Sequence, residues 1–226
     1  MDFALSPRAQ ALCQQLDAFL QRYVLPHNPA WHASVQQGVY PPPFLEDLKT
    51  LAREEGLWNL FLPSLDAAAP GKGLSNLDYA PLAERMGRVH WASEVFNCSA
   101  PDTGNMELLH RFANAQQRTQ WLEPLLNGHI RSAFAMSEPD VASSDPTSLQ
   151  TTVRRDGNQL VLNGRKWFIT GVAHPHCKLL IVMARNAPDG GSNDPTAASA
   201  HHQHSMVLLP LDTPGVQVVR NIPVVH

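Results

Sequence analysis

The spacing of apolar residues changes near residue 130, and this change constrains the fold of the 226-residue chain more than any other feature. Before that point apolar residues recur three or four apart, as on one face of a helix. After it they fall in short runs separated by turn residues, which is typical of β-strands. We therefore predict an α+β protein, with an N-terminal all-helical domain over 1–130 and an antiparallel β-barrel-like domain over 131–226.

Capping residues and prolines mark the helix boundaries in the first domain. Ser6 and Pro7 are an N-cap and a first helical residue, so a helix is predicted from Pro7 until Pro26 stops the pattern. Gly56 follows a second apolar stripe in a position typical of a C-cap. The further helices are predicted over 44–52, 75–86, 104–113 and 115–126.

Short strands separated by turns are predicted in the second domain. Asp156-Gly157-Asn158 is a hairpin turn, because Gly and Asn tolerate positive φ. The segment 186–204 has no apolar period and is predicted as a mobile loop, so its histidines, His201, His202 and His204, lack the fixed geometry that a metal needs. The strands are predicted over 132–136, 149–154, 159–163, 167–170, 179–185, 206–209 and 216–219.

Composition excludes several classes of function. The 17 Lys and Arg residues are scattered and the formal net charge is -3, so no basic face for nucleic acid is expected. The three cysteines are far apart, which supports neither a disulfide framework nor a zinc site. No apolar run approaches the roughly 18 residues of a membrane span, and no targeting segment is recognisable, so a cytoplasmic protein without membrane contact is expected.

Two segments carry candidate chemistry: FAMSEPDVASSD over 134–145 and NGRKWFITG over 163–171. The first resembles a strand that runs into a loop of small hydroxyl residues, which could offer hydroxyl and backbone N–H groups to a phosphate or to a polar ring edge. A serine-rich turn without a ligand is the alternative. Trp167 and Phe168 could likewise belong to the core instead of facing a cofactor.

The order and spacing of these two segments resemble the signature of the acyl-CoA dehydrogenase family. The resemblance extends upstream to 82–87 and 116–128. The forms EGLWNLFLP (55–63) and SAPDTGNMELL (99–109) are most similar to the subgroup in which the dehydrogenase module is fused to aminoglycoside-phosphotransferase-like domains. The resemblance implies FAD as cofactor, an acyl-CoA substrate, electron-transferring flavoprotein as acceptor and a homo-oligomer at full length.

The resemblance also implies roles for residues of the first segment. Phe134, Met136 and Ser137 would lie against the flavin ring and its pyrimidine edge, with the Ser137 hydroxyl or N–H as a hydrogen-bond partner. Ser143 would approach the pyrophosphate, and Ser144 would lie where cofactor and acyl-CoA meet. The loop is one residue longer than the family pattern, which leaves open which serine touches which group.

In the second segment, Phe168, Ile169 and Thr170 would contact the cofactor. Phe168 stands where the family usually has Trp and would cover the flavin face opposite the substrate, while Thr170 would donate a hydrogen bond near N5. Ser99 would lie near the acyl pocket. Glu138 belongs to the loop motif, and a structural role is expected for it.

No acid in this sequence matches the family's catalytic base, which is expected beyond His226 in a second helical domain. The resemblance therefore implies the N-terminal and middle domains of a dehydrogenase that removes hydrogen from the α and β carbons of an acyl-CoA. Two alternatives stay open: a non-catalytic flavin- or acyl-CoA-binding remnant, and a family member with oxidase or monooxygenase chemistry.

Overall fold

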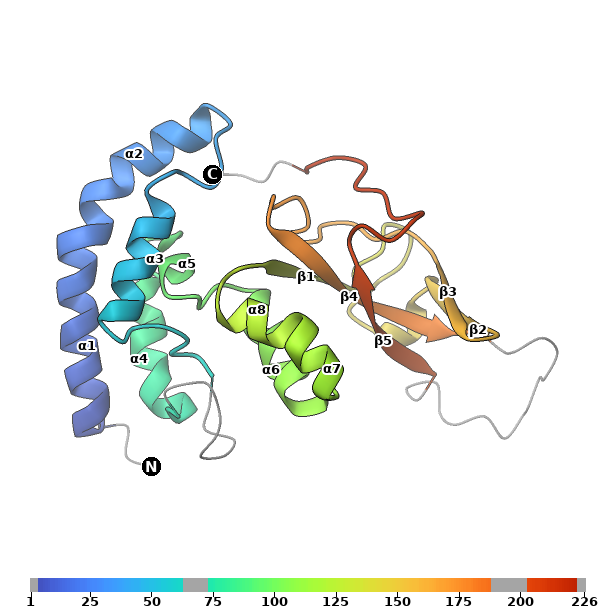
Figure 1. Cartoon of the computed structure of the whole chain (residues 1–226), viewed down its shortest axis with the longest axis horizontal. Coiled ribbons are helices and arrows are strands. Elements are labelled where there is room, and N and C mark those ends of the chain that lie inside the picture. Colours follow the sequence, from blue (N-terminus) through green and yellow to red (C-terminus); the bar gives the residue numbers. More distant parts are fainter. Residues whose placement is uncertain (1–3, 63–72, 188–202, 223–226) are drawn as a thin grey trace. The chain divides into compact units, whose positions relative to one another are not determined.

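The computed structural model describes residues 4–62, 73–187 and 203–222. The chain divides into two compact units, 1–128 and 129–226 (Figure 1). The first unit is helical. Its helices are α1 (Pro7–Phe19), α2 (Leu25–Gln36), α3 (Leu45–Glu54), α4 (Asn76–Met86), α5 (Ala92–Val95), α6 (Asp102–Phe112), α7 (Ala115–Gln117) and α8 (Glu123–Leu126), with π-helical turns η1 (Leu20–Val24) and η2 (Arg118–Leu122).

The predicted caps are present at both ends of the helical pattern. The Ser6 hydroxyl accepts the Ala9 N–H at 3.1 Å, which begins α1. Gly56 has φ 69 after α3, and the N–H of the next residue, Leu57, donates to the Ala52 carbonyl at 2.8 Å. The Leu57 bond satisfies one of the last carbonyls of α3, as in a Schellman motif.

The prediction that the first helix stops at Pro26 is wrong, because the helical path continues through α2 to Gln36. A π-turn precedes the proline, and in it the Leu25 N–H donates to the Leu20 carbonyl five residues back. Because this turn is wider, the helical path continues although Pro26 has no N–H to donate. The same solution recurs at η2, which ends two residues before Pro124.

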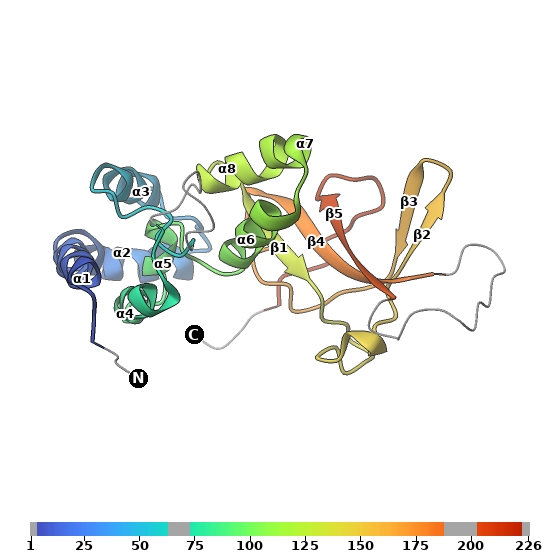
Figure 2. The ribbon, with the colours of Figure 1, turned by 90° about the horizontal axis from the view of Figure 1, so that it is seen from below.

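Aromatic side chains fill much of the core of the helical unit. Phe19 of α1 meets the ring of Phe96 edge-on at 5.2 Å, and Trp31 of α2 stacks on Trp91 with ring centroids 4.6 Å apart. Helices α1, α3 and α4 run side by side and are seen end-on in Figure 2. The apolar stripe predicted for the first helix faces this core through Leu16, Phe19 and Leu20. Of the apolar residues predicted to face it from 75–86, Leu77 and Ala80 are instead exposed.

Two asparagines close the C-terminal end of α8. Asn97 and Asn59 both have left-handed backbones, with φ 53 and 56. The Asn97 amide donates to the Leu125 carbonyl at 3.0 Å and to the Asn59 side-chain oxygen at 2.7 Å, and the Asn59 amide donates to the Leu126 carbonyl at 3.0 Å. The final carbonyls of this helix are therefore satisfied by buried side chains.

The second unit is built on a mixed five-stranded sheet with β4 at its centre (Figure 1). Strand β5 pairs antiparallel along one edge of β4. Strands β1 and β2 both pair parallel with β4, at successive stretches of it, and β3 pairs antiparallel with β2. The strands are β1 (Arg131–Ala135), β2 (Thr152–Asp156), β3 (Gln159–Asn163), β4 (Cys177–Asn186) and β5 (His204–Pro210).

The α+β order is confirmed, but the antiparallel, barrel-like sheet is a wrong prediction, because two strand pairs are parallel and the described strands do not close into a barrel. Strands β2 and β3 are joined by a tight turn at Gly157, which has φ 59. The connections over 136–151 and 164–176 are long, and each joins two strands that are not neighbours in the sheet. Both candidate segments lie in these connections.

Two of the predicted strands are absent from the described residues of the sheet. At 167–170 the backbone is interrupted by Phe168 with φ 50, and 216–219 makes no strand pairing. Alternation misled the prediction at both places: Ile169 and Val216 pack against the sheet, whereas Phe168 and Val218 are exposed. Of the predicted loop 186–204, residues 188–202 lie outside the described residues, and His204 is the first residue of β5.

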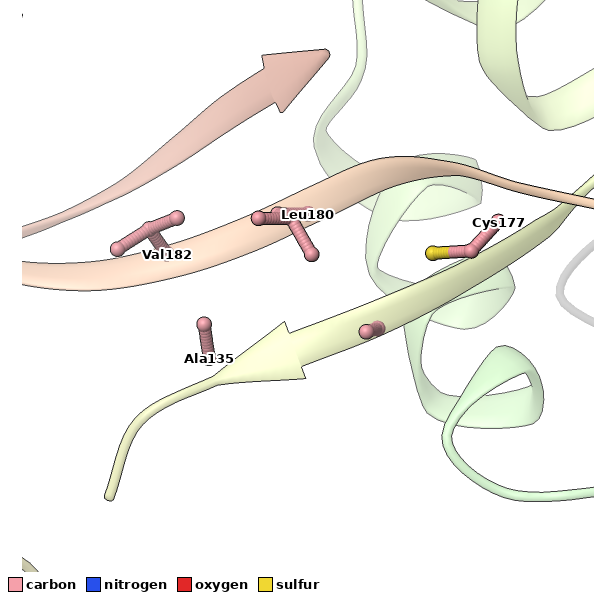
Figure 3. Close-up of a cluster of buried hydrophobic side chains, with 5 residues drawn as sticks. Ala135, Cys177, Leu180 and Val182 are labelled. Atoms are coloured by element: carbon pink, nitrogen blue, oxygen red, sulfur yellow. The ribbon is translucent and has the colours of Figure 1, made fainter. Parts of the chain in front are cut away.

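A small hydrophobic cluster fixes β1 against β4. Figure 3 shows side chains of both strands meeting on one face of the sheet, with Ala135 near Val182 and with Cys177 at the other end of the cluster. The register pairs Ala133 with Leu180 and Ala135 with Val182. This packing of β1 against β4 holds the end of β1, where the first candidate segment begins.

All three cysteines of the chain are buried and none forms a disulfide.

Candidate functional site

The fold brings the two candidate segments together. The first continues from β1 and the second from β3. The Trp167 N–H donates to the Ser137 carbonyl at 3.0 Å, and an exposed ion pair joins Arg165 to Asp140 at 3.1 Å. Residues separated by about 30 positions in sequence therefore form one surface.

A buried ion pair lies at the junction of the segments. The Lys166 ammonium donates to the Met136 carbonyl and to a Glu138 carboxylate oxygen, both at 2.8 Å. The Glu138 side chain is only 4% exposed and also accepts the N–H groups of Gln150 at 2.7 Å and Thr151 at 2.9 Å. This carboxylate thus ties both segments to the start of β2, and the structural role predicted for Glu138 agrees with these contacts.

The surroundings of Glu138 stabilise its charged form. Burial alone would raise the pKa of this carboxyl, but the Lys166 ammonium and the N–H groups of Gln150 and Thr151 outweigh burial and lower the pKa from 4.5 to about 2. Burial also lowers the pKa of Lys166, and the bond to Glu138 offsets part of that effect. A carboxyl with so low a pKa is a poor proton acceptor at neutral pH.

We expect this ion pair to make the second unit acid-sensitive. The pKa of Glu138 is depressed in the folded state, so its contribution is complete above about pH 4.5 and is lost as the pH falls towards 2. The contribution is about 3 kcal/mol. Urea unfolding of the wild type and of Glu138→Gln from pH 7 to pH 3 measures it, because the stability difference between the two proteins should shrink as the pH falls. A difference independent of pH would contradict this expectation.

The second segment begins in a tight approach to β2. A Cβ built on Gly164 would lie 2.6 Å from the Thr151 Cβ and 2.7 Å from its Cα. Real Cβ atoms do not approach other atoms so closely, so this position has room only for glycine. The approach positions Lys166, two residues later, beside Glu138.

The hydroxyl-rich loop is held by its own side chains. The Ser143 hydroxyl accepts the Glu138 N–H at 2.7 Å and donates to the Val141 carbonyl at 3.2 Å, while the Asp145 carboxylate accepts the Thr147 N–H at 2.9 Å. Ser144, between them, is exposed. The loop is therefore ordered from within, and Ser144 faces outwards as a residue that can meet a ligand.

Two aromatic rings of the second segment face solvent. Trp167 is 41% exposed and Phe168 is 55% exposed, with ring centroids 4.8 Å apart. The alternative that these rings belong to the core is therefore wrong. Ile169 anchors the segment on the sheet and Thr170 is exposed. Exposed aromatic side chains held by a rigid support are typical of a ligand-contacting surface.

The remaining predicted residues divide between the two units. Phe134 on β1, Met136 and Ser137 are half-buried at the end of the strand. In the described part of the chain, the Ser137 N–H meets no hydrogen-bond acceptor. Ser99 belongs to the helical unit, where its hydroxyl lies 3.1 Å from that of Ser93.

The arrangement suits a planar, polar-edged group with an acidic tail. It combines exposed aromatic faces, an N–H at Ser137 that can donate, and an exposed hydroxyl at Ser144. Within residues 4–62, 73–187 and 203–222, no group of three or more His, Cys, Asp or Glu side chains could hold a metal ion, and no helix is long and apolar enough to cross a membrane.

The chain is thus a two-unit protein, in which a helical unit precedes a mixed sheet whose connections carry the two candidate segments. The chain matches the model of the acyl-CoA dehydrogenase N-terminal domain over residues 6–129 and that of the middle domain over 133–225. It therefore belongs to the acyl-CoA dehydrogenase family. The family binds FAD.

Relatives support the family and the subgroup. The "Probable acyl-CoA dehydrogenase FadE2" of Mycobacterium tuberculosis is 50% identical over 99% of this chain and 53% of its own length. Acyl-CoA dehydrogenase family member 11 of Gallus gallus is 45% identical over 98% of this chain and 28% of its own. An acyl-CoA dehydrogenase homologue from Mycobacterium abscessus has a solved structure with TM-score 0.87 and 48% identity, covering 97% of this chain and 54% of that one.

The chain thus spans about half the length of FadE2 and less of family member 11. The resemblance to the subgroup with additional fused domains is confirmed by these matches and by mouse family member 10, which is 46% identical over 97% of this chain.

Sequence reasoning missed the residues that join the two segments. Lys166 lies within the quoted NGRKWFITG motif but received no role, and Gly164 and Thr151 were not singled out. The sequence held no clear signal for Lys166, because it follows Arg165 in a segment whose neighbouring side chains are exposed. The other segment holds three acids, Glu138, Asp140 and Asp145, and no local pattern shows which of them pairs with Lys166.

Proposed function

We propose that this chain forms the N-terminal and middle-domain part of an FAD-dependent acyl-CoA dehydrogenase. The observation that carries the proposal is the joined surface of the two segments, with exposed Trp167 and Phe168 beside the available N–H of Ser137. Family membership supports FAD as the group that this surface takes and an acyl-CoA thioester as the substrate. When bound, FAD supplies an acceptor for the hydride that leaves the β-carbon of the thioester.

The site residues have distinct proposed tasks. Phe134, Met136 and Ser137 lie along the ring and its pyrimidine edge, and the Ser137 N–H donates to that edge. Phe168 covers one face, Ile169 anchors the segment and Thr170 donates near N5. Ser144 contacts the cofactor tail or the acyl-CoA, whereas the Ser143 hydroxyl chiefly orders the loop through its bonds to Glu138 and Val141.

The proton acceptor for the substrate α-carbon is not assigned to a residue of this chain. Glu138 is the buried acid of the site, and its bond to Lys166 and its pKa of about 2 indicate a structural role. Electron-transferring flavoprotein is the electron acceptor proposed for the whole enzyme, and Ser99 is the proposed contact with the acyl chain.

Visible absorption tests the proposal. The purified 226-residue chain is mixed with FAD, and the spectrum is recorded before and after anaerobic addition of an acyl-CoA series. We expect FAD to bind with a perturbed spectrum and to stay oxidised, because none of the described residues is proposed as the base. Bleaching by acyl-CoA would show that the chain holds a base, and absence of any perturbation would contradict the flavin site. Rapid oxygen consumption during turnover would instead favour an oxidase.

A further inference from the structure

A buried cation touches a backbone peptide at the proposed flavin edge. The Lys166 side chain is 11% exposed, and its ammonium donates to the Met136 carbonyl at 2.8 Å. This carbonyl belongs to the peptide that links Met136 to Ser137. The N–H on the other side of the same peptide is that of Ser137, which meets no acceptor in the part of the chain that the structure describes.

The two ends of a peptide group are electronically coupled. Donation to the carbonyl oxygen increases the polarity of the N–H, so hydrogen bonds in series strengthen one another. A charged donor has a larger effect than a neutral one, and a buried charge is little screened by solvent or salt. The Lys166 ammonium therefore makes the Ser137 N–H a stronger donor than an ordinary backbone amide.

Glu138 keeps the ammonium in place. Its carboxylate shares the Lys166 ammonium and is itself fixed by the N–H groups of Gln150 and Thr151. The lysine cannot turn towards solvent without leaving a buried carboxylate without its cation, which is costly. The ammonium that contacts the Met136 carbonyl is thus also held by a buried carboxylate.

We propose that Lys166 is a positioning residue that polarises the Met136–Ser137 peptide, so that the Ser137 N–H binds reduced FAD in preference to oxidised FAD. The proposal rests on the proposed function, because it takes the pyrimidine edge of FAD as the partner of Ser137. That edge gains electron density when the flavin is reduced, and a stronger donor therefore favours the reduced form.

The polarisation can be measured without FAD. The ¹⁵N–¹H resonance of Ser137 is recorded in the 226-residue chain, in Lys166→Met, and in Lys166→Arg. We expect the Ser137 nitrogen to move upfield in Lys166→Met, because its peptide carbonyl loses a charged donor, and to return part of the way in Lys166→Arg. The matched control is Arg165→Met, which removes the neighbouring cation of the exposed Asp140 ion pair and should leave Ser137 unchanged.

The preference for reduced FAD is measured by anaerobic titration of each variant with oxidised and with reduced FAD. We expect the ratio of the dissociation constant of reduced FAD to that of oxidised FAD to rise about fivefold in Lys166→Met, since the loss of one strengthened hydrogen bond changes binding by a factor of this order. The ratio should stay at the wild-type value in Arg165→Met.

Each result decides the proposal. The proposal would be overturned if both forms of FAD bound more weakly with an unchanged ratio, or if the Ser137 resonance did not move. Lys166 would then have a structural role only. If Lys166→Met does not fold, Glu138→Gln/Lys166→Met removes the uncompensated buried charge and takes its place in both measurements. If the wild type binds neither form of FAD, the proposed function fails and the preference for reduced FAD fails with it, while the Ser137 resonance still shows whether Lys166 polarises the peptide.

Discussion

Gly164→Ala is expected to destabilise the second unit by about 4 kcal/mol. The new methyl group would lie 2.7 Å from the Thr151 Cα, which is backbone and cannot rotate away. Relief requires the start of the second segment to move off β2, and this movement would carry Lys166 away from Glu138. The ion pair at the junction would therefore be lost together with the packing.

Urea unfolding followed by far-UV circular dichroism measures the loss, and hydrogen exchange locates it. The matched control is Gly157→Ala, at a position with φ 59 and with nothing within 4 Å of the added Cβ. That change brings conformational strain alone and should cost about 1 kcal/mol. We expect faster exchange at Gln150 and Thr151 in Gly164→Ala only. Equal costs for the two variants would mean that the close approach to Thr151 does not matter.

Asn97→Ala is expected to destabilise the helical unit to a similar extent, by about 4 kcal/mol. The change removes the donor to the Leu125 carbonyl and to the Asn59 side-chain oxygen, and each buried acceptor left without a partner costs about 1 to 3 kcal/mol. Alanine must also adopt φ 53, which costs about 1 kcal/mol more.

Asn97→Gly separates these two contributions. Glycine accepts a left-handed backbone without strain but provides no donor, so this variant should recover about 1 kcal/mol relative to Asn97→Ala. Tryptophan fluorescence during urea unfolding reports mainly on the helical unit, which contains four of the five tryptophans, Trp31, Trp58, Trp91 and Trp121. Equal stability of Asn97→Ala and the wild type would show that the end of α8 finds other donors.

Local signals in the sequence predicted the helices well because they depend on neighbouring residues. The caps at Ser6 and Gly56 each involve residues within one helical turn, and their effects are visible in sequence. Pro26 misled the prediction for the opposite reason. A π-turn absorbs the proline at that place, and nothing local distinguishes an absorbed proline from one that ends a helix.

The second unit shows where local patterns stop being informative. Alternation suggested a strand at 167–170, but Phe168 adopts φ 50 and the segment forms a loop. The apolar residue in this alternation, Ile169, packs on the sheet, and an irregular segment can bury one side chain in this way as well as a strand can. Strand direction could not be predicted from the sequence either. The pairing of β1 and β2 with β4 is non-local, and it depends on the paths of the connections, which the sequence alone does not show.

The sequence by itself determined the order of helical and β-sheet parts, the family and the two segments that form the candidate site, since periodicity, capping and motif spacing are properties of the chain. Only the tertiary structure decided how those segments meet. Glu138 and Lys166 are 28 positions apart and pair because Gly164 allows the chain to approach Thr151 closely. A contact of this kind depends on packing between distant segments, where neighbouring N–H groups offset the cost of burying the ion pair.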